Sequence, residues 1–276
     1  LRIGQDVRYA TPDDPTDLEF WVSPMEPAKA LSNALWGRIG ACILTSATLA
    51  NQGKFDIPAR TLGLPVSSGL IVDGAFHYPS QGRLVVPSLA GDPRDDRAHA
   101  ERIAEYLMAR VNQGTGILVL FTSWRLCFQV EELLDQSVRD ATLVQGQKPL
   151  STTLADHEAR RADGQTSIIF GLQSMAEGID LPGDLANEVV ITRLPFHPPD
   201  DPREATFAEY LKNHGRDAFT ELSLPAAAIR LRQAVGRLIR SETDTGQVTI
   251  LDRRLVHTRW GQSLLRELPA FEFIEE

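Results

Sequence analysis

The sequence predicts an α/β fold in which a mainly parallel sheet is covered by helices on both faces. From about residue 70 onward, short and wholly apolar runs of strand length alternate with segments of helical periodicity. This alternation is typical of βαβ units, and strands that are buried on both faces read as continuous apolar runs. The chain has 276 residues and is 42% hydrophobic, which is ample for one large α/β domain or two small ones.

Charge and composition narrow the classes of function. The net charge of −9 disfavours a broad basic surface for nucleic acid but permits a narrow track of amides, hydroxyls and a few arginines. No apolar run approaches a membrane span, and no secretory signal is present. Cys42 and Cys127 both lie in apolar runs, which predicts buried, reduced thiols in a cytoplasmic protein. Because residue 1 is Leu, we expect a piece of a longer protein.

The first fifty residues contain one hydroxyl-rich run of interest. Residues 1–20 are expected to form a polar lead-in or a hairpin with a short strand at 18–22, and residues 27–38 a helix. The run 41–49 (ACILTSATL) then predicts a buried strand followed by a loop at its carboxyl end. Ligands of open α/β sheets bind at that end, although such hydroxyls can also merely satisfy terminal backbone groups.

Residues 51–93 are rich in Gly and Pro and are expected to form a crossover with an early strand, and residues 94–111 are expected to form a helix. A strand–loop–helix unit follows. The apolar run 117–121 predicts a buried strand, and the next residues (TSWR, 122–125) lead into a helix that reaches about residue 134. Hydroxyls at a helix amino terminus are suited to holding a phosphate. A plain helix cap by Ser123 is the alternative.

A second loop stands at the end of a second buried strand. A strand at 141–146, a helix at 153–163 and a strand at 166–170 lead into residues 171–182 (GLQSMAEGIDLP). Glycines that bracket polar and acidic residues directly after a strand favour a shaped functional loop over a generic connection. A strand at 189–194, a stiff Pro-rich excursion at 195–202, a short helix at 207–213, a strand at 247–252 and a closing helix at 260–268 complete the prediction.

The run 224–240 (LPAAAIRLRQAVGRLIR) predicts one amphipathic helix that begins near Pro225. At about 100° per residue, one face is apolar and the other presents an amide and three arginines. The apolar positions are Ala228, Leu231, Val235, Leu238 and Ile239, and the polar positions are Arg230, Gln233, Arg237 and Arg240. A solvated basic face is the simpler reading. Gly236, costly inside a helix, suggests instead a close approach to the backbone.

The strings TSATL, FTSWR, VQGQ, GLQSMAEGIDL, QAVGRLIR and DRRL occur in the order of the C-terminal half of DinG/YoaA-like helicases. The chain thus resembles the XPD-related, iron–sulfur branch of the superfamily 2 ATP-dependent DNA helicases. This resemblance implies a RecA-like three-layer domain and ATP-driven 5′ to 3′ movement along single-stranded DNA, in DNA repair or replication-conflict contexts. It also implies that residues 1–50 are the tail of a first RecA-like domain and residues 51–276 the second.

The resemblance implies roles by position. Arg240 would be the arginine finger, accompanied by Gln233 and by Arg237, which would lie near the β/γ bridge or an acidic partner such as Asp180. The residues expected near ATP are Glu177, Gly178, Asp180 and Gly236. The residues expected near DNA are Thr122, Ser123, Arg125, Gln145, Gln173 and Ser174. The residues expected to couple the two sites are Thr45, Ser46 and Thr48.

Several parts of a complete helicase are missing from the sequence. There is no G-x-x-x-x-G-K-[ST] phosphate loop, no acidic box for Mg²⁺, no set of four cysteines and no clustered metal-site spacing. We therefore expect that the complete enzyme uses ATP and Mg²⁺, that any iron–sulfur cluster belongs to the N-terminal half, and that this chain is inactive without that half. The alternative is a non-catalytic RecA-like module that binds nucleic acid or protein. A nuclease ranks lower.

Overall fold

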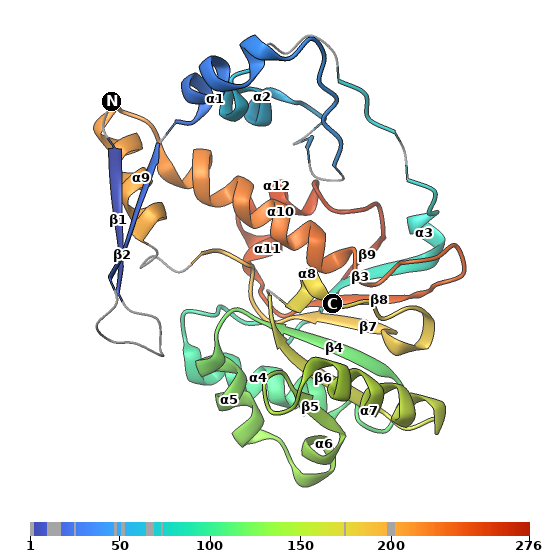
Figure 1. Cartoon of the computed structure of the whole chain (residues 1–276). Coiled ribbons are helices and arrows are strands. Elements are labelled where there is room, and N and C mark those ends of the chain that lie inside the picture. Colours follow the sequence, from blue (N-terminus) through green and yellow to red (C-terminus); the bar gives the residue numbers. More distant parts are fainter. Residues whose placement is uncertain are drawn as a thin grey trace. The chain divides into compact units, whose positions relative to one another are not determined.

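The computed structural model describes residues 3–9, 18–24, 26–46, 49–50, 53–64, 69–72, 74–173, 175–197 and 202–276 (Figure 1). The chain divides into two compact units. The first unit comprises residues 1–73 and 197–226, and the second comprises residues 74–196 and 227–276. Compactness thus divides the chain differently from the expected boundary at residue 50, and the assignment of residues 1–50 to a first RecA-like domain stays a prediction.

The first unit contains a hairpin and several short helices. Strands β1 (Ile3–Tyr9) and β2 (Leu18–Pro24) pair antiparallel, so the hairpin alternative for the amino terminus is confirmed. The helical segments are α1 (Ala28–Ala34), η1 (Trp36–Arg38), α2 (Asp56–Leu62), α9 (Pro202–Asn213) and a π-helical turn (Phe219–Ser223). The indole of Trp36 donates a hydrogen bond to the carbonyl of Leu62 at 2.5 Å, which ties η1 to α2.

The prediction of a buried strand at 41–49 is wrong for the residues that the structure describes there. Residues 41–46 have no regular structure, Ile43 is 92% exposed, and Cys42 is exposed rather than buried. An apolar run becomes a strand only where neighbouring strands accept and donate its backbone hydrogen bonds. No described strand pairs with these residues.

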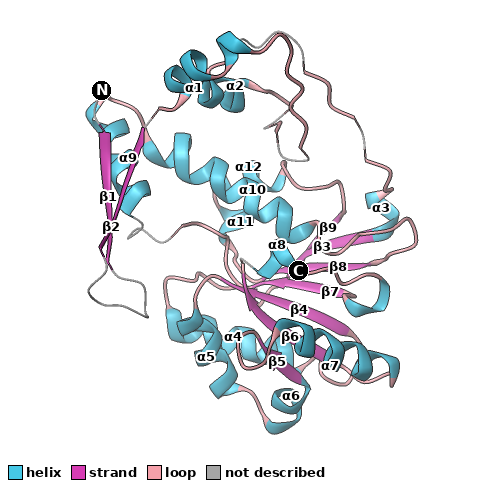
Figure 2. Ribbon diagram, viewed as in Figure 1, coloured by secondary structure: helices cyan, strands magenta, loops and turns pink. Residues whose placement is uncertain are grey.

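The second unit is built on a seven-stranded, wholly parallel sheet with the order β5-β6-β4-β7-β8-β3-β9 (Figure 2). The strands are β3 (Gly82–Val86), β4 (Gly116–Phe121), β5 (Thr142–Val144), β6 (Ser167–Leu172), β7 (Glu188–Ile191), β8 (Gly246–Ile250) and β9 (Glu272–Glu275). All six residues of strand β4, which pairs with β6 on one side and β7 on the other, are buried. The predicted parallel sheet is confirmed.

Helices cover both faces of this sheet. Helices α4, α5 and α6 lie on one side in Figure 1, and α10, α11 and α12 lie on the other. The helices are α3 (Tyr78–Gln81), α4 (Asp96–Met108), α5 (Trp124–Leu133), α6 (Gln136–Ala141), α7 (Leu150–Ala162), α8 (Met175–Gly178), η2 (Gly183–Leu185), α10 (Leu224–Val235), α11 (Arg254–His257) and α12 (Arg259–Leu265). The three-layer α/β class is thereby confirmed.

A large apolar cluster fills the space between the sheet and helices α4, α5 and α6. Phe121 of β4 and Phe170 of β6 meet edge to face there, with their ring centroids 4.9 Å apart. Ile103, Leu107 and Val130 are completely buried against the same layer. This rigid core holds the carboxyl ends of the strands in place, and the candidate site lies at those ends. Within the described part of the chain, no helix is both long and apolar enough to pass through a membrane.

Candidate nucleotide and nucleic-acid site

Helix α10 ends at Val235, five residues before the predicted end at Arg240. The amides of Arg237 and Leu238 turn to i−3 carbonyls, at 3.1 and 3.2 Å, which tightens and closes the last turn. The amides of Arg240 and Ser241 then donate to the buried carboxylate of Asp244, at 2.7 and 2.8 Å. The carboxylate of Asp244 thus replaces the helical carbonyl oxygens as the acceptor for these two amides. Arg237 and Arg240 therefore lie on the segment that follows α10.

The predicted division into two faces nevertheless holds. The five apolar positions Ala228, Leu231, Val235, Leu238 and Ile239 are all buried. The expected close approach at Gly236 is not seen among the described residues. There, the atoms within 4 Å of an added Cβ are carbonyl oxygens of the preceding turn, those of Arg232 and Gln233. A Cβ at this position would lie 3.2 Å from the carbonyl oxygen of Arg232, which is a tight contact at the end of the helix.

Arg237 and Arg240 both contact the loop after β6. The guanidinium of Arg237 donates to the carbonyl oxygen of Ile179 at 3.1 Å. The guanidinium of Arg240 forms an ion pair with Asp180, in which Nη2 lies 2.6 Å and Nε 2.7 Å from the same carboxylate oxygen. The structure therefore brings together two stretches that lie about sixty residues apart in the sequence. It pairs Asp180 with Arg240, whereas Arg237 takes a backbone carbonyl.

Two glutamines hold the loop ends at the carboxyl edge of the sheet. The side-chain oxygen of Gln145, after β5, accepts a hydrogen bond from the amide of Leu172 at 2.8 Å. The side chain of Gln173 donates to the carbonyl of Arg230 on α10 at 3.1 Å, and its backbone amide donates to Phe121 at 3.0 Å. These contacts join the ends of β4, β5 and β6 to α10, so both side chains already have positioning roles.

The segment after β4 starts helix α5. The hydroxyl of Ser123 accepts a hydrogen bond from the amide of Leu126 at 3.3 Å, so the predicted cap is confirmed. Thr122 is half-buried, and Arg125 is largely exposed, with its Nη2 3.7 Å from Asp96. These three residues lie on the segment that leads from the carboxyl end of β4 into the first turn of α5.

The remaining predicted site residues are dispersed. Gln233 is half-buried on α10, and Gly178 is exposed at the end of α8. Thr45 and Ser46 belong to the irregular stretch of the first unit. Thr48 and Ser174 lie outside the described residues, as does the side chain of Glu177.

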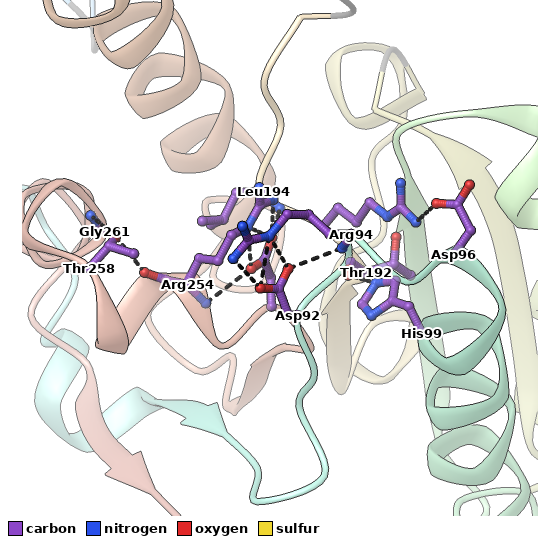
Figure 3. Close-up of polar contacts among 11 residues, drawn as sticks. Asp92, Arg94, Asp96, His99, Thr192, Leu194, Arg254, Thr258 and Gly261 are labelled. Carbon is purple, nitrogen blue, oxygen red and sulfur yellow. Dashed lines mark hydrogen bonds and ion pairs between the residues drawn. The ribbon is translucent and has the colours of Figure 1, made fainter.

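Sequence reasoning missed a polar cluster at the ends of β7 and β8 (Figure 3). The completely buried carboxylate of Asp252 accepts hydrogen bonds from the amide of Leu194 at 3.0 Å and from Nη2 of Arg254 at 2.7 Å. Asp92 and Arg94 form the same Asp-x-Arg pair at the surface, at 2.6 Å. The repeated spacing, at 92–94 and 252–254, was the signal that could have identified both pairs.

His99 of α4 lies beside this cluster, next to Thr192 (Figure 3). Its Nε2 lies 2.8 Å from the carbonyl oxygen of Thr192, and because a carbonyl only accepts, Nε2 carries the proton. Within the described residues, Nδ1 has no hydrogen-bond partner. Burial lowers the pKa of His99 to about 4, so the ring is neutral at pH 7.

The described residues include no group of three or more His, Cys, Asp or Glu side chains that could hold a metal ion. What the site offers is guanidinium groups, amides and hydroxyls at the carboxyl edge of a parallel sheet. Such donors suit phosphate oxygens, with which arginine forms paired hydrogen bonds.

Curated relatives match most of the chain. The ATP-dependent DNA helicase DinG of Photobacterium profundum is 37% identical over 271 residues, which is 96% of this chain and 39% of that protein. The ATP-dependent DNA helicase DinG of Escherichia coli K12 is 38% identical over 250 residues, which is 87% of this chain and 34% of that protein. The chain therefore spans little more than a third of the length of these relatives.

Solved structures agree on the fold. An XPD helicase superimposes with a TM-score of 0.66 at 19% identity, over 93% of this chain and 46% of that one. An apo XPD structure gives a TM-score of 0.64 at 22% identity, over 93% of this chain and 53% of that one. The family model for the helicase C-terminal domain matches residues 105–271, which contain most of the sheet and both arginines of the site. The chain belongs to the helicase C-terminal domain family.

Proposed function

We propose that this chain is the second RecA-like motor domain of a DinG-type ATP-dependent DNA helicase and that it supplies the arginine finger. The observation that carries the proposal is the convergence of Arg237 and Arg240 on residues 179–180. Two permanently charged, planar groups at one edge of a parallel sheet fit the phosphates of a nucleotide. ATP supplies the phosphoryl group to be transferred, and Mg²⁺ is expected to be held by the other half of the enzyme.

Arg240 is the better choice for the finger. Its partner Asp180 is 68% exposed, and an ion pair this open contributes about 1 kcal/mol or less. Exchanging that carboxylate for a phosphate therefore costs little. Arg237 is held by a backbone carbonyl and is assigned to the β/γ bridge. Gln233, Gly236, Glu177, Gly178 and Asp180 complete the proposed nucleotide side.

The proposed DNA track follows the carboxyl ends of β4, β5 and β6, where open sheets bind ligands. Its members are Thr122, Ser123, Arg125, Gln145, Gln173 and Ser174. We assign coupling to Thr45, Ser46 and Thr48 from the resemblance alone. The 5′ to 3′ movement, the role in DNA repair, the cytoplasmic location and the partnership with a first RecA-like domain rest on the resemblance too. So does the possible iron–sulfur cluster of the N-terminal half.

The test is ATP turnover by the parent-length protein, with and without single-stranded DNA. Arg240→Ala is expected to lower the DNA-stimulated rate by about 10³-fold or more while nucleotide binding persists, because the finger stabilises charge in the transition state. Arg266→Ala is the matched control, since Arg266 is an exposed arginine outside the site. This chain by itself is expected to show no turnover.

Two outcomes would reject the proposal. Full turnover by Arg240→Ala would remove the finger from this residue. An unmodified parent protein without DNA-stimulated turnover would instead indicate a non-catalytic RecA-like module that binds nucleic acid or protein.

A further inference from the structure

Two arginines that follow neighbouring strands of the sheet both contact the carboxylate of Asp96. Asp96, in the first turn of α4, accepts a hydrogen bond from Nη2 of Arg193 at 2.6 Å. Its second oxygen lies 3.7 Å from Nη2 of Arg125. Arg193 follows β7, and Arg125 lies in the first turn of α5, after β4. These two strands are paired in the sheet. The guanidiniums are therefore gathered at the carboxyl edge of the sheet, on the segments that follow β4 and β7.

The backbone on both sides of Arg193 is fixed by buried groups. The amide and the hydroxyl of Thr192 both donate to the carbonyl of Leu120, at 3.1 and 2.9 Å, and the carbonyl of Thr192 accepts from His99. On the other side, the amide of Leu194 donates to Asp252 (Figure 3). The Asp252 cluster thus holds the segment that presents Arg193, so little ordering is needed when this side chain binds a ligand.

Charge at this point is unbalanced in favour of an anion. Two guanidiniums share the single carboxylate of Asp96, which leaves one positive charge in excess. Nε of Arg193 is buried and has no acceptor among the described residues. Arg125 is 76% exposed, so one of the two groups is open to a ligand. An additional oxyanion at the exposed side of the two guanidiniums would neutralise the excess charge.

We propose that Arg193 and Arg125 form a binding site for one backbone phosphate of single-stranded DNA, and that Asp96 competes with this phosphate for the two guanidiniums. The inference rests on the proposed function, because it adds a contact to the proposed DNA track. A backbone phosphate fits better than a base edge, because it carries the negative charge that balances the excess guanidinium, whereas a base edge is neutral. Asp96 keeps binding weak enough for the strand to be released.

The experiment measures binding of the parent-length protein to a fluorescent oligothymidylate by anisotropy, over a series of salt concentrations. Arg193→Gln is expected to weaken binding about threefold to tenfold and to reduce the slope of log affinity against log salt by about 0.7, the value for one lost phosphate contact on a single strand. Asp96→Asn, which frees both arginines, is expected to tighten binding severalfold.

The control is Arg97→Gln. Arg97 neighbours Asp96 on α4, is 89% exposed and pairs with Glu101, so the variant removes the same charge outside the site. Its affinity should stay near that of the unmodified protein. Misfolding cannot tighten DNA binding by Asp96→Asn. Weaker binding by Arg193→Gln together with tighter binding by Asp96→Asn therefore shows a specific effect on this site and not a general loss of structure. ATP binding, measured with a fluorescent analogue, should be unchanged in all three variants.

Three results of these binding measurements would contradict the proposed phosphate site, and each leads to a different conclusion. If the unmodified protein binds oligothymidylate but Arg193→Gln and Asp96→Asn bind equally well, this site is overturned and the proposed function stands. If Arg193→Gln impairs ATP binding instead of DNA binding, the phosphate belongs to the nucleotide and the inference is overturned. If the unmodified protein binds no single-stranded DNA, both the site and the proposed function are overturned.

Discussion

Arg240 and Asp180 form an ion pair that remains open to solvent, with Nη2 2.6 Å from the carboxylate and the arginine side chain one-third exposed. The backbone amide of Arg240 is fixed separately, by the buried carboxylate of Asp244. The position of this residue therefore does not depend on its ion pair. This separation allows the guanidinium to change partner while the chain around it stays folded.

Substitution of Asp180, which pairs with the guanidinium of Arg240, should change the free energy of unfolding much less than substitution of Asp244, which holds its backbone amide. Asp180→Asn and Arg240→Ala are expected to change the free energy of unfolding by less than about 1 kcal/mol, because the pair is exposed. Asp244→Ala leaves three donors without their acceptor and should cost about 2 kcal/mol. Urea unfolding measures all three. A large loss in Arg240→Ala would mean that its effect on turnover reports folding rather than chemistry.

The two Asp-x-Arg pairs offer a matched test of burial. Asp252 and Asp92 each accept hydrogen bonds from the backbone and side chain of the arginine two residues later. Only Asp252 is completely buried, and only it also holds the amide of Leu194. Asp252→Ala should destabilise the protein by about 3 kcal/mol, since the half-buried guanidinium of Arg254 and the buried amide of Leu194 lose their acceptor. Asp92→Ala should cost less than about 1 kcal/mol. Equal losses in the two variants would contradict this assignment.

His99 should make the fold sensitive to mild acid. Its pKa is lowered by burial to about 4 in the folded chain, against about 6.5 for an exposed histidine. Between these values the unfolded chain binds a proton that the folded chain does not. Stability is therefore complete above pH 6.5 and falls as the pH drops towards 4, by up to about 3 kcal/mol.

His99→Gln should reduce the dependence of the unfolding free energy on pH between 6.5 and 4. The exposed His257, in the same unit, provides the control variant His257→Gln, which should keep the dependence of the unmodified protein. The other buried histidine, His157, has its pKa lowered by burial too, so some dependence of the same sign should persist in His99→Gln. Identical pH profiles for His99→Gln and the unmodified chain would count against this role.

The two cysteines should differ in reactivity. Cys127 is buried in α5, and burial raises the pKa of its thiol to about 12. Cys42 is exposed. Alkylation of the native chain at pH 8, followed by mass spectrometry, should label Cys42 within minutes and Cys127 only after denaturant is added, because the thiolate is the reactive form. Rapid native labelling of Cys127 would show that the core of the second unit opens readily.

The strands of the second unit were predictable because burial on both faces leaves a simple pattern. The apolar runs at 117–121 and 166–170 became β4 and β6, within two residues of the expected bounds. Strand β9 was missed, because it has only four residues, two of which are glutamates, and it pairs at the edge of the sheet. Such a strand depends on its neighbour β3 rather than on its own composition.

The same apolar pattern failed at 41–46, where no described strand supplies partners. The end of α10 was missed for a related reason. Asp244 lies beyond the helix in the sequence, and only its position in space reveals that it takes the amides of Arg240 and Ser241. Periodicity placed the two faces of this helix correctly but could not tell where the helix stops.

Local sequence by itself indicated the apolar strands β4 and β6, the cap at Ser123 and the chemical character of the arginine-bearing segment, because each of these leaves a pattern in residues close together in the chain. Tertiary structure decided which groups meet. It joined Arg240 to Asp180 and Arg193 to Asp96, and it buried one Asp-x-Arg pair while leaving the other in solvent. The physical reason is that burial and long-range pairing depend on how the strands are ordered in the sheet, which no single segment encodes.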